Sequence, residues 1–237
     1  MTDTPDFPAL LASITRCNAV YETDDAVARA AFAGLGCAVL GRISDAEHQA
    51  VASIPADGIP TLTISGTRVS EGSTSDTLGD LWQDVDFTPV NVGGGAIVAS
   101  GAHARASIYA WMLALHPGPW RIEGHSLGGQ TTHVAPLFVP LDSLHSMIAW
   151  EPPKAGNALF YEAYAPWFLR CTTIVHGRDP WAAWPWTSAA LVHPAPLLWL
   201  QKDSWSVGGW PGAGLPLRWA DHDTDQVMLA VRALVAA

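Results

Sequence analysis

Hydrophobic residues near both ends of the chain recur with the spacing of amphipathic helices. The first set lies three or four residues apart: Leu10, Ile14, Cys17 and Tyr21. A second helix is expected over 25–35, because Gly36 follows it and glycine commonly ends a helix. A short third helix is expected from Ser44, which would cap it. The last helix is expected over 223–237, with one apolar face made of Val227, Val231, Leu234 and Val235.

Between these helices the hydrophobic period changes. Short apolar or β-branched runs predict strands, which we place at 61–65, 120–123, 146–150 and 172–176, with shorter extended pieces at 90–92 and 96–99. A helix is expected over 102–116, and residues 68–80 have the composition of a loop. Because strands alternate with helices, the sequence predicts an α/β fold with a mostly parallel central sheet covered by helices on both faces.

Length and composition favour one domain with a large core. The chain has 237 residues, of which 49% are apolar, so we expect a single domain over 1–237. The chain also contains twelve tryptophans. These fit either an aromatic core or an apolar surface that contacts apolar substrates or partners.

Charge and segment composition argue against several classes of protein. The net charge is −10 without a basic cluster, which argues against nucleic-acid binding. No run approaches the 18 apolar residues of a membrane span. Cys17, Cys37 and Cys171 show neither a disulfide framework nor metal-ligand spacing. The first six residues are polar and acidic rather than a secretory signal, so a cytoplasmic location is expected, with secretion after removal of a signal left open.

Ser126 is the candidate nucleophile. It stands in the middle of Gly-His-Ser-Leu-Gly, between a predicted strand and a predicted helix. In α/β-hydrolases this context forms the nucleophile elbow, a sharp turn that exposes the serine hydroxyl. Glycines two residues before and after the serine remove side chains that would clash in that turn. The alternative is an inert serine in a glycine-rich turn.

A serine needs a base, and the chain has nine histidines. In this fold class the order along the chain is serine, acid, histidine. His222 is the last histidine and lies just before the terminal helix, so chain order selects it. His125 neighbours the serine, but its side chain is expected to point away from the attacked face.

The acid must lie between Ser126 and His222 to orient the base and stabilise its charge. The acids considered are Asp142, Glu151, Glu162, Asp179 and Asp203. Asp179 is preferred because it follows a predicted strand, where functional groups of α/β sheets gather, and Asp203 is the alternative. For the oxyanion, the backbone N–H groups of Thr67 and Leu127 are expected to be the donors.

Five segments resemble the class 3 lipases, the fungal triacylglycerol lipase type with bacterial and plant relatives. They occur in the family's order, from about Leu10 to the end: 64–67, 124–129, 150–157, 179–185 and 221–225. The resemblance implies an α/β-hydrolase with a triad of Ser126, Asp179 and His222, and with oxyanion donors at Thr67 and Leu127. It further implies that residues 68–84 act as a lid and that Asp84 supports the oxyanion residue.

The departures from the family's pattern leave the substrate open. They are Ser65 for arginine, Gln130 for a small residue, Glu151 for glycine, Asp225 for tyrosine, and Pro136, which should shorten the helix after the serine. None removes a member of the triad.

The expected function is hydrolysis of a carboxylic ester through an acyl-enzyme, without a metal or organic cofactor. A lipid-like or long-acyl ester is the expected substrate, with transient contact to a lipid interface. Three alternatives remain: a short-chain esterase, a peptidase with the same triad, and a hydrolase-fold binding protein that has lost turnover.

Overall fold

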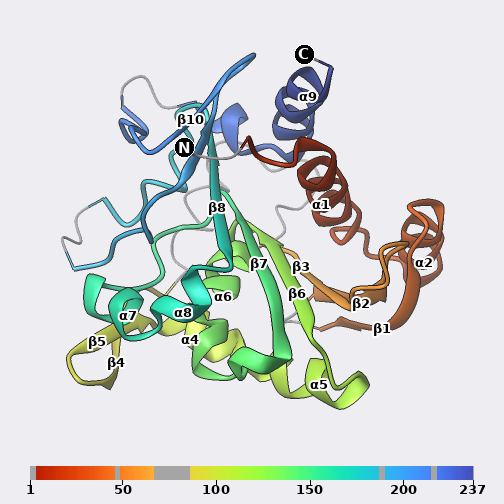
Figure 1. Cartoon of the computed structure of the whole chain (residues 1–237), viewed down its shortest axis with the longest axis horizontal. Coiled ribbons are helices and arrows are strands. Elements are labelled where there is room, and N and C mark those ends of the chain that lie inside the picture. Colours follow the sequence, from red (N-terminus) through yellow and green to blue (C-terminus); the bar gives the residue numbers. More distant parts are fainter. Residues whose placement is uncertain (1–3, 46–48, 67–85, 187–189, 215–217, 237) are drawn as a thin grey trace.

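The computed structural model describes residues 4–45, 49–66, 86–186, 190–214 and 218–236. Within this part of the chain an eight-stranded sheet runs through the centre of the molecule (Figure 1). Its strands, in spatial order, are β1 (Ala38–Ser44), β2 (Gln49–Ile54), β3 (Thr61–Ile64), β6 (Trp120–His125), β7 (Leu144–Trp150), β8 (Cys171–His176), β9 (Leu198–Leu200) and β10 (Trp205–Val207). The pairings from β3 to β9 are parallel, and those at both edges are antiparallel.

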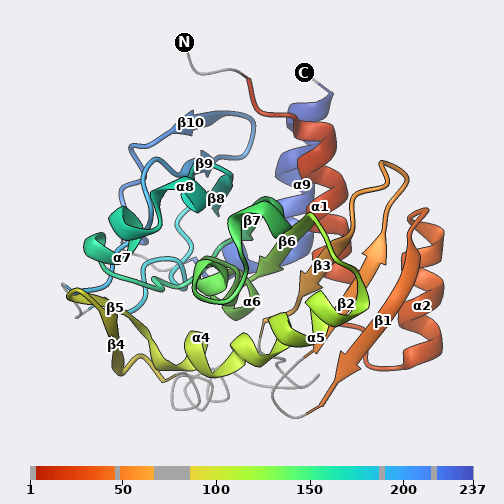
Figure 2. The same cartoon turned by 60° about the horizontal axis from the view of Figure 1, so that its bottom comes forward.

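Helices cover both faces of the sheet, as the sequence predicts. They are α1 (Phe7–Ala19), α2 (Asp25–Gly34), α4 (Ser100–Ala104), α5 (Ile108–Leu115), α6 (Leu127–Val134), α7 (Ala158–Ala163), α8 (Ala165–Phe168) and α9 (Thr224–Val235). The first and last helices of the chain, α1 and α9, lie side by side on one face (Figures 1 and 2). The helices α5 and α6 cover the other face. No helix in the described segments is long and apolar enough to cross a membrane.

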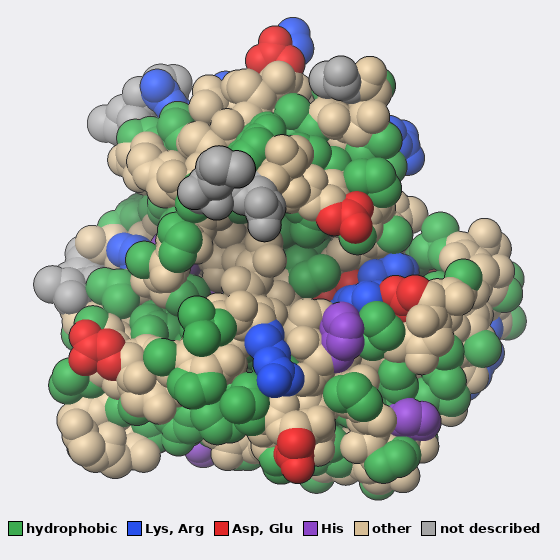
Figure 3. Space-filling model, in the orientation of Figure 1, with side chains coloured by type: hydrophobic (Ala, Val, Ile, Leu, Met, Phe, Trp, Pro, Cys, Tyr) green, Lys and Arg blue, Asp and Glu red, His purple; other side chains and the backbone are tan. Residues whose placement is uncertain are grey.

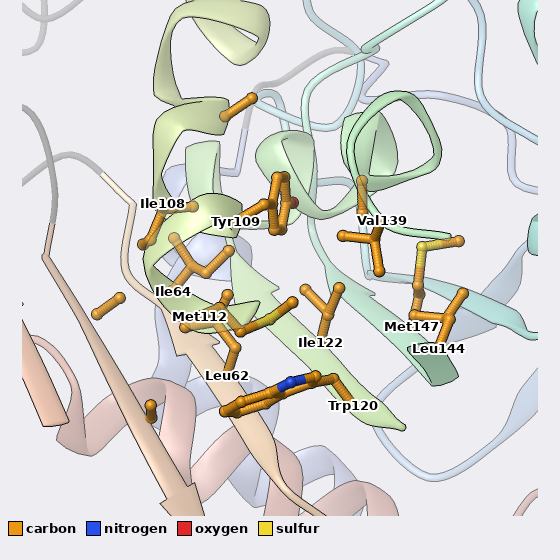
Figure 4. Packing of buried hydrophobic residues seen from close by; sticks show 14 residues of the cluster. Leu62, Ile64, Ile108, Tyr109, Met112, Trp120, Ile122, Val139, Leu144 and Met147 are labelled. Carbon is orange, nitrogen blue, oxygen red and sulfur yellow. The ribbon is translucent and has the colours of Figure 1, made fainter. Parts of the chain in front are cut away.

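The alternation of side chains along β6 divides the core between the two faces. Trp120 and Ile122 are fully buried in the cluster under α5, together with Leu62 and Met112 (Figure 4). Glu123, the next residue of β6, points the other way and contacts Arg16 of α1. A strand has a two-residue period, so His125 at the end of β6 also faces the side of α1.

The N-terminal part of the sheet corrects one prediction. Ser44 is the last residue of β1, which pairs with β2 in antiparallel register, so the chain turns between two strands where a helix was expected; residues 46–48 lie outside the described residues. Nearly all of β2 is buried, so its sequence lacks the polar alternation that marks a half-exposed strand. A short apolar run of this kind cannot be distinguished from a buried helix by periodicity.

Smaller differences concern helix boundaries. The helix expected over 102–116 is divided into α4 and α5 by a 3-10 turn at Arg105–Ser107. Tyr21 lies beyond the end of α1. Val235 lies in α9 but is 43% exposed, whereas Val227 and Val231 are buried. The pieces at 90–92 and 96–99 pair as a separate hairpin of β4 (Pro89–Gly93) and β5 (Ala96–Ala99).

Most of the tryptophans are half-buried or buried. Of the eleven in the described segments, three are buried, seven are half-buried and only Trp186 is exposed. Figure 3 shows hydrophobic side chains over the lower part of one face, with few charged groups between them. The most exposed large hydrophobic residues lie on separate elements, such as Leu169 after α8 and Leu229 on α9. Most of the tryptophans therefore lie at the boundary between core and surface, with three in the core.

Candidate active site

Ser126 occupies the sharp turn between β6 and α6. Its backbone has φ 58° and ψ −125°, a left-handed conformation that costs a non-glycine residue free energy and is concentrated at functional sites. The flanking glycines make this turn possible. A Cβ on Gly124 would lie 2.4 Å from the carbonyl of Gly128, and one on Gly128 would lie 2.3 Å from the carbonyl oxygen of Ile64.

His222 and Asp179 are hydrogen-bonded to each other, although 43 residues separate them. Nδ1 of His222 lies 3.0 Å from Oδ2 of Asp179. Asp179 is fully buried in the loop after β8, and its carboxylate accepts hydrogen bonds from the backbone N–H groups of Trp181 and Ala182. The structure thus gives His222 an oriented acid partner.

Asp221 links the loop of Asp179 to the 3-10 turn Trp219–His222. Its carboxylate accepts a hydrogen bond from the backbone N–H of Arg178 at 2.8 Å. Its carbonyl oxygen lies 3.0 Å from Nδ1 of His176 at the end of β8. These contacts hold the backbone on both sides of the Asp179–His222 pair.

His222 contacts His125, the residue before the serine, at 3.1 Å between its carbonyl oxygen and Nε2 of His125. The described residues show no hydrogen bond between the Ser126 hydroxyl and His222, although the ring of the adjacent His125 lies 4.7 Å from the ring of His222, centroid to centroid. In enzymes without substrate such bonds are often long and tighten only in the complex. The arrangement is compatible with transfer of the serine proton to His222.

The expected oxyanion donors are only partly visible. Leu127 is the first residue of α6, so its N–H has no partner within the helix and is available to an anion. Thr67, the expected lid at 68–84 and Asp84 lie outside the described residues. Gly66, which precedes Thr67, packs directly on the serine: a Cβ on it would lie 2.6 Å from Cβ of Ser126.

His125 takes part in a hydrogen-bonded chain beneath the elbow. The Gly66 N–H donates to the Tyr21 hydroxyl at 2.9 Å, and that hydroxyl lies 2.8 Å from Nδ1 of His125. Nε2 of His125 lies 3.1 Å from the carbonyl oxygen of His222. A carbonyl only accepts, so Nε2 carries the hydrogen and Nδ1 accepts from Tyr21. His125 was expected to point away from the attacked face. Its ring connects the segment after β3, through Tyr21, to the backbone of His222.

Glu151 is a residue of this cluster that was not preferred as the acid from the sequence. It was one of the acids between serine and histidine, and its place directly after β7 was the available signal. The structure buries it completely, in a left-handed conformation with φ 48°. Its Oε2 lies 3.2 Å from Nε2 of His125 and 3.8 Å from Nδ1 of His222. Burial, and then the charge of Asp179, raise the pKa of this carboxyl group.

The same cluster is the candidate metal site of the described segments. Ligand atoms of His125, Glu151 and His222 lie within 4.8 Å of one another. Both histidines are already engaged, one with Tyr21 and the carbonyl of His222, the other with Asp179. A metal ion would compete with the hydrogen bond that orients His222, so the donor set fits an acid–base function better. The alternative acid, Asp203, is recorded in no hydrogen bond or ion pair with His222.

Beneath the elbow, a buried ion pair joins α1 to the sheet. Arg16 contacts both carboxylate oxygens of Glu123, at 2.7 Å and 2.8 Å. The Thr63 hydroxyl of β3 donates to the same carboxylate at 2.8 Å. Glu123 is fully buried, three residues before Ser126. Two planar groups paired in this bidentate way fix α1 against β6.

Three histidines with lowered pKa values should make folding sensitive to mild acid. Burial lowers the pKa of His125 well below its usual range, that of His133 to about 3 and that of His193 to about 4. An unfolded chain protonates these histidines near pH 6.5, whereas the folded chain does not. Stability is therefore fully present above about pH 6.5 and is lost as the pH falls toward the folded-state pKa values.

The raised pKa of Glu151 acts in the opposite direction and offsets part of this loss. His133 and His193, with pKa values of about 3 and about 4, each take up about one proton on unfolding between pH 6 and 5, so a net loss of stability is expected over this interval. Urea unfolding at a series of pH values measures this loss. A flat profile or a gain in stability between pH 6 and 5 would contradict the prediction.

Comparison with solved structures shows the fold. No protein-family model and no curated protein sequence matches the chain. Lipase II from Rhizopus niveus superposes with a TM-score of 0.63 at 16% identity, over 92% of this chain and 91% of that one. Rhizomucor miehei triacylglyceride lipase gives 0.64 at 14% identity, over 92% and 94%.

A third structure, described as a triacylglycerol lipase whose catalytic centre is a serine protease triad, gives 0.62 at 16% identity, over 91% and 90%. Each match spans nearly the whole of both chains. The predicted fold class is thereby confirmed. The chain has the α/β-hydrolase fold of the fungal triacylglycerol lipases.

Proposed function

We propose that the protein is a serine carboxylic-ester hydrolase with Ser126, Asp179 and His222 as its catalytic triad. One observation carries the proposal: the 3.0 Å hydrogen bond between His222 and the buried Asp179, beside a serine in a strained strand-to-helix turn. The similar structure described as a lipase with a serine protease triad supports the same assignment.

The reaction follows from these positions. Nε2 of His222 takes the hydroxyl proton of Ser126 while Oγ attacks the acyl carbonyl. Asp179 orients the ring and stabilises the imidazolium that forms. The N–H groups of Leu127 and Thr67 hold the oxyanion. His222 then gives its proton to the leaving alcohol, and a water molecule repeats the sequence to release the carboxylic acid.

The proposed substrate is a lipid-like or long-acyl ester. Trp181 packs on Leu127 in an apolar cluster that includes Phe87 and Trp219, and its ring lies 5.8 Å from the ring of His222. Apolar side chains therefore lie next to both the oxyanion donor and the base. Each buried methylene of an acyl chain contributes about 0.8 kcal/mol.

A chain-length series of chromogenic esters tests this substrate class. We expect kcat/KM to rise from acetyl to octanoyl esters, and Trp181→Leu to reduce that ratio because it removes apolar surface beside His222. Trp186→Leu is the matched control, since Trp186 is exposed. A clear preference for acetyl would refute the lipase-like form and leave an esterase.

A fluorophosphonate probe tests the triad itself. Folded wild-type protein should be labelled, and Ser126→Ala should not. Absence of labelling in folded wild-type protein would favour the alternative function, a binding protein on a hydrolase fold. Cleavage of amides at rates comparable with esters would favour the peptidase alternative.

A further inference from the structure

A second buried carboxyl group, that of Glu151, lies close to the ring of His222. Oε2 of Glu151 is 3.8 Å from Nδ1 of His222, the same nitrogen that Asp179 contacts at 3.0 Å. Both carboxyl groups are fully buried. They approach from neighbouring strands, because Glu151 follows β7 and Asp179 lies in the loop after β8.

The hydrogen bonds around Glu151 do not prevent its carboxyl group from interacting with His222. Nε2–H of His125 can be shared between the His222 carbonyl and Oε2 of Glu151, at 3.1 Å and 3.2 Å. His125 itself does not depend on Glu151, because it is also held by Tyr21. The other oxygen, Oε1, accepts no well-aligned hydrogen bond among the described residues, although the backbone of His176 is near enough to favour the ionised carboxyl group. A buried carboxyl group with incomplete hydrogen bonding is costly and suggests a functional reason for its retention.

The charges around Glu151 explain its protonation state. It faces Asp179 directly, with Asp221 and Asp223 further away, and its burial is complete. Burial and these negative charges favour the neutral acid. His125 is neutral as well, because burial and the nearby His222 lower its pKa. Two close carboxyl groups in one buried site do not both ionise readily, and the raised pKa of Glu151 favours its protonated form.

We propose that Glu151 is a second acid of this site, which lies beside the Asp179–His222 pair and takes the place of Asp179 as the partner of Nδ1 when Asp179 is absent. This inference rests on the proposed hydrolase function. In that state Glu151 releases its proton to solvent, Nδ1–H of His222 donates to the resulting carboxylate, and the carboxylate stabilises the imidazolium formed at Nε2. The movement required is small, from 3.8 Å to hydrogen-bond distance.

A double-mutant cycle tests this role. Asp179→Ala should retain part of its activity, with kcat/KM lowered by about 10²-fold, whereas loss of an acid without a substitute costs about 10⁴-fold. Adding Glu151→Gln to Asp179→Ala should remove the remainder, although Gln keeps the size of the side chain. Adding Glu162→Gln, which changes an exposed glutamate on α7 in the same way, should have no further effect.

The pH profile separates an acid from a structural support. In Asp179→Ala, ionisation of Glu151 should add a second step to the acidic limb of kcat/KM that deprotonation of His222 sets, and Glu151→Gln should remove that added step. Asp179→Asn, which keeps the shape of the loop, replaces Asp179→Ala in the cycle if the alanine variant does not fold by thermal unfolding. Equal rates and profiles with and without Glu151→Gln would overturn the inference.

Ester hydrolysis and probe labelling of the wild-type protein distinguish failure of the hydrolase proposal from failure of the proposal for Glu151. If wild type hydrolyses esters and is labelled at Ser126 while the cycle shows no coupling, only the role of Glu151 fails. If wild type is neither active nor labelled, the hydrolase function fails and the second acid fails with it.

Discussion

Replacing Ser126 by alanine, His222 by alanine, or both together is expected to lower kcat by the same factor, on the order of 10⁶. The serine attacks only when the histidine takes its proton, so removal of either group disables the same step. The second substitution should therefore add almost nothing to the first. The rate that remains comes from the oxyanion donors and from substrate binding.

Steady-state hydrolysis of an activated ester, with mass spectrometry to exclude contaminating hydrolase, measures these rates. His145→Ala is the matched control, because His145 is exposed at the start of β7 and, among the described residues, its ring hydrogen-bonds the adjacent Ser146 hydroxyl. It should leave kcat within about twofold, as expected for a surface change. Losses that multiply in the double variant would show that Ser126 and His222 act independently, contrary to a triad.

Replacing Arg16 by alanine is expected to lower the free energy of unfolding by about 3–5 kcal/mol. The substitution leaves the Glu123 carboxylate fully buried with only the Thr63 hydroxyl as a recorded partner. A buried charge without its counter-ion loses solvation without compensation. The loss is large compared with the 5–15 kcal/mol that typically stabilises a folded domain.

Urea unfolding followed by tryptophan fluorescence measures the loss. Arg29→Ala is the matched control, since Arg29 pairs with Asp25 at 2.8 Å on α2 but both side chains are about half-exposed. An exposed pair contributes at most about 1 kcal/mol. If the two variants lost similar free energy, the Arg16–Glu123 pair would not be the link between α1 and the sheet that the geometry indicates.

The sequence predicted the local features of the fold well. The strands at 61–65, 120–123, 146–150 and 172–176 correspond to β3, β6, β7 and β8. The terminal helices were also predicted, because amphipathic spacing is a local property of the chain. The hairpin of β1 and β2 was missed, because β2 is buried along almost its whole length and has no readable alternation.

The site was predicted as far as chain order and short motifs reach. The glycines around Ser126 predict a sharp turn, because only small residues fit there. The position of His222 just before the last helix led to its prediction as the base. Asp179 was preferred from its place after a strand, and the structure records its hydrogen bond to His222. The roles of these three residues in catalysis remain predictions, as do the oxyanion donor Thr67 and the lid at 68–84.

The sequence by itself determined which segments form the parallel strands, where the sharp turn at Ser126 falls and which side chains stand at strand ends, because neighbouring residues decide these properties. The tertiary structure alone decided which distant groups meet. Arg16 and Glu123 are 107 residues apart, and Glu151 reaches His222 only because β7 lies between β6 and β8. Burial and the charge of Asp179 then decide how Glu151 ionises, and neither can be read from its position along the chain.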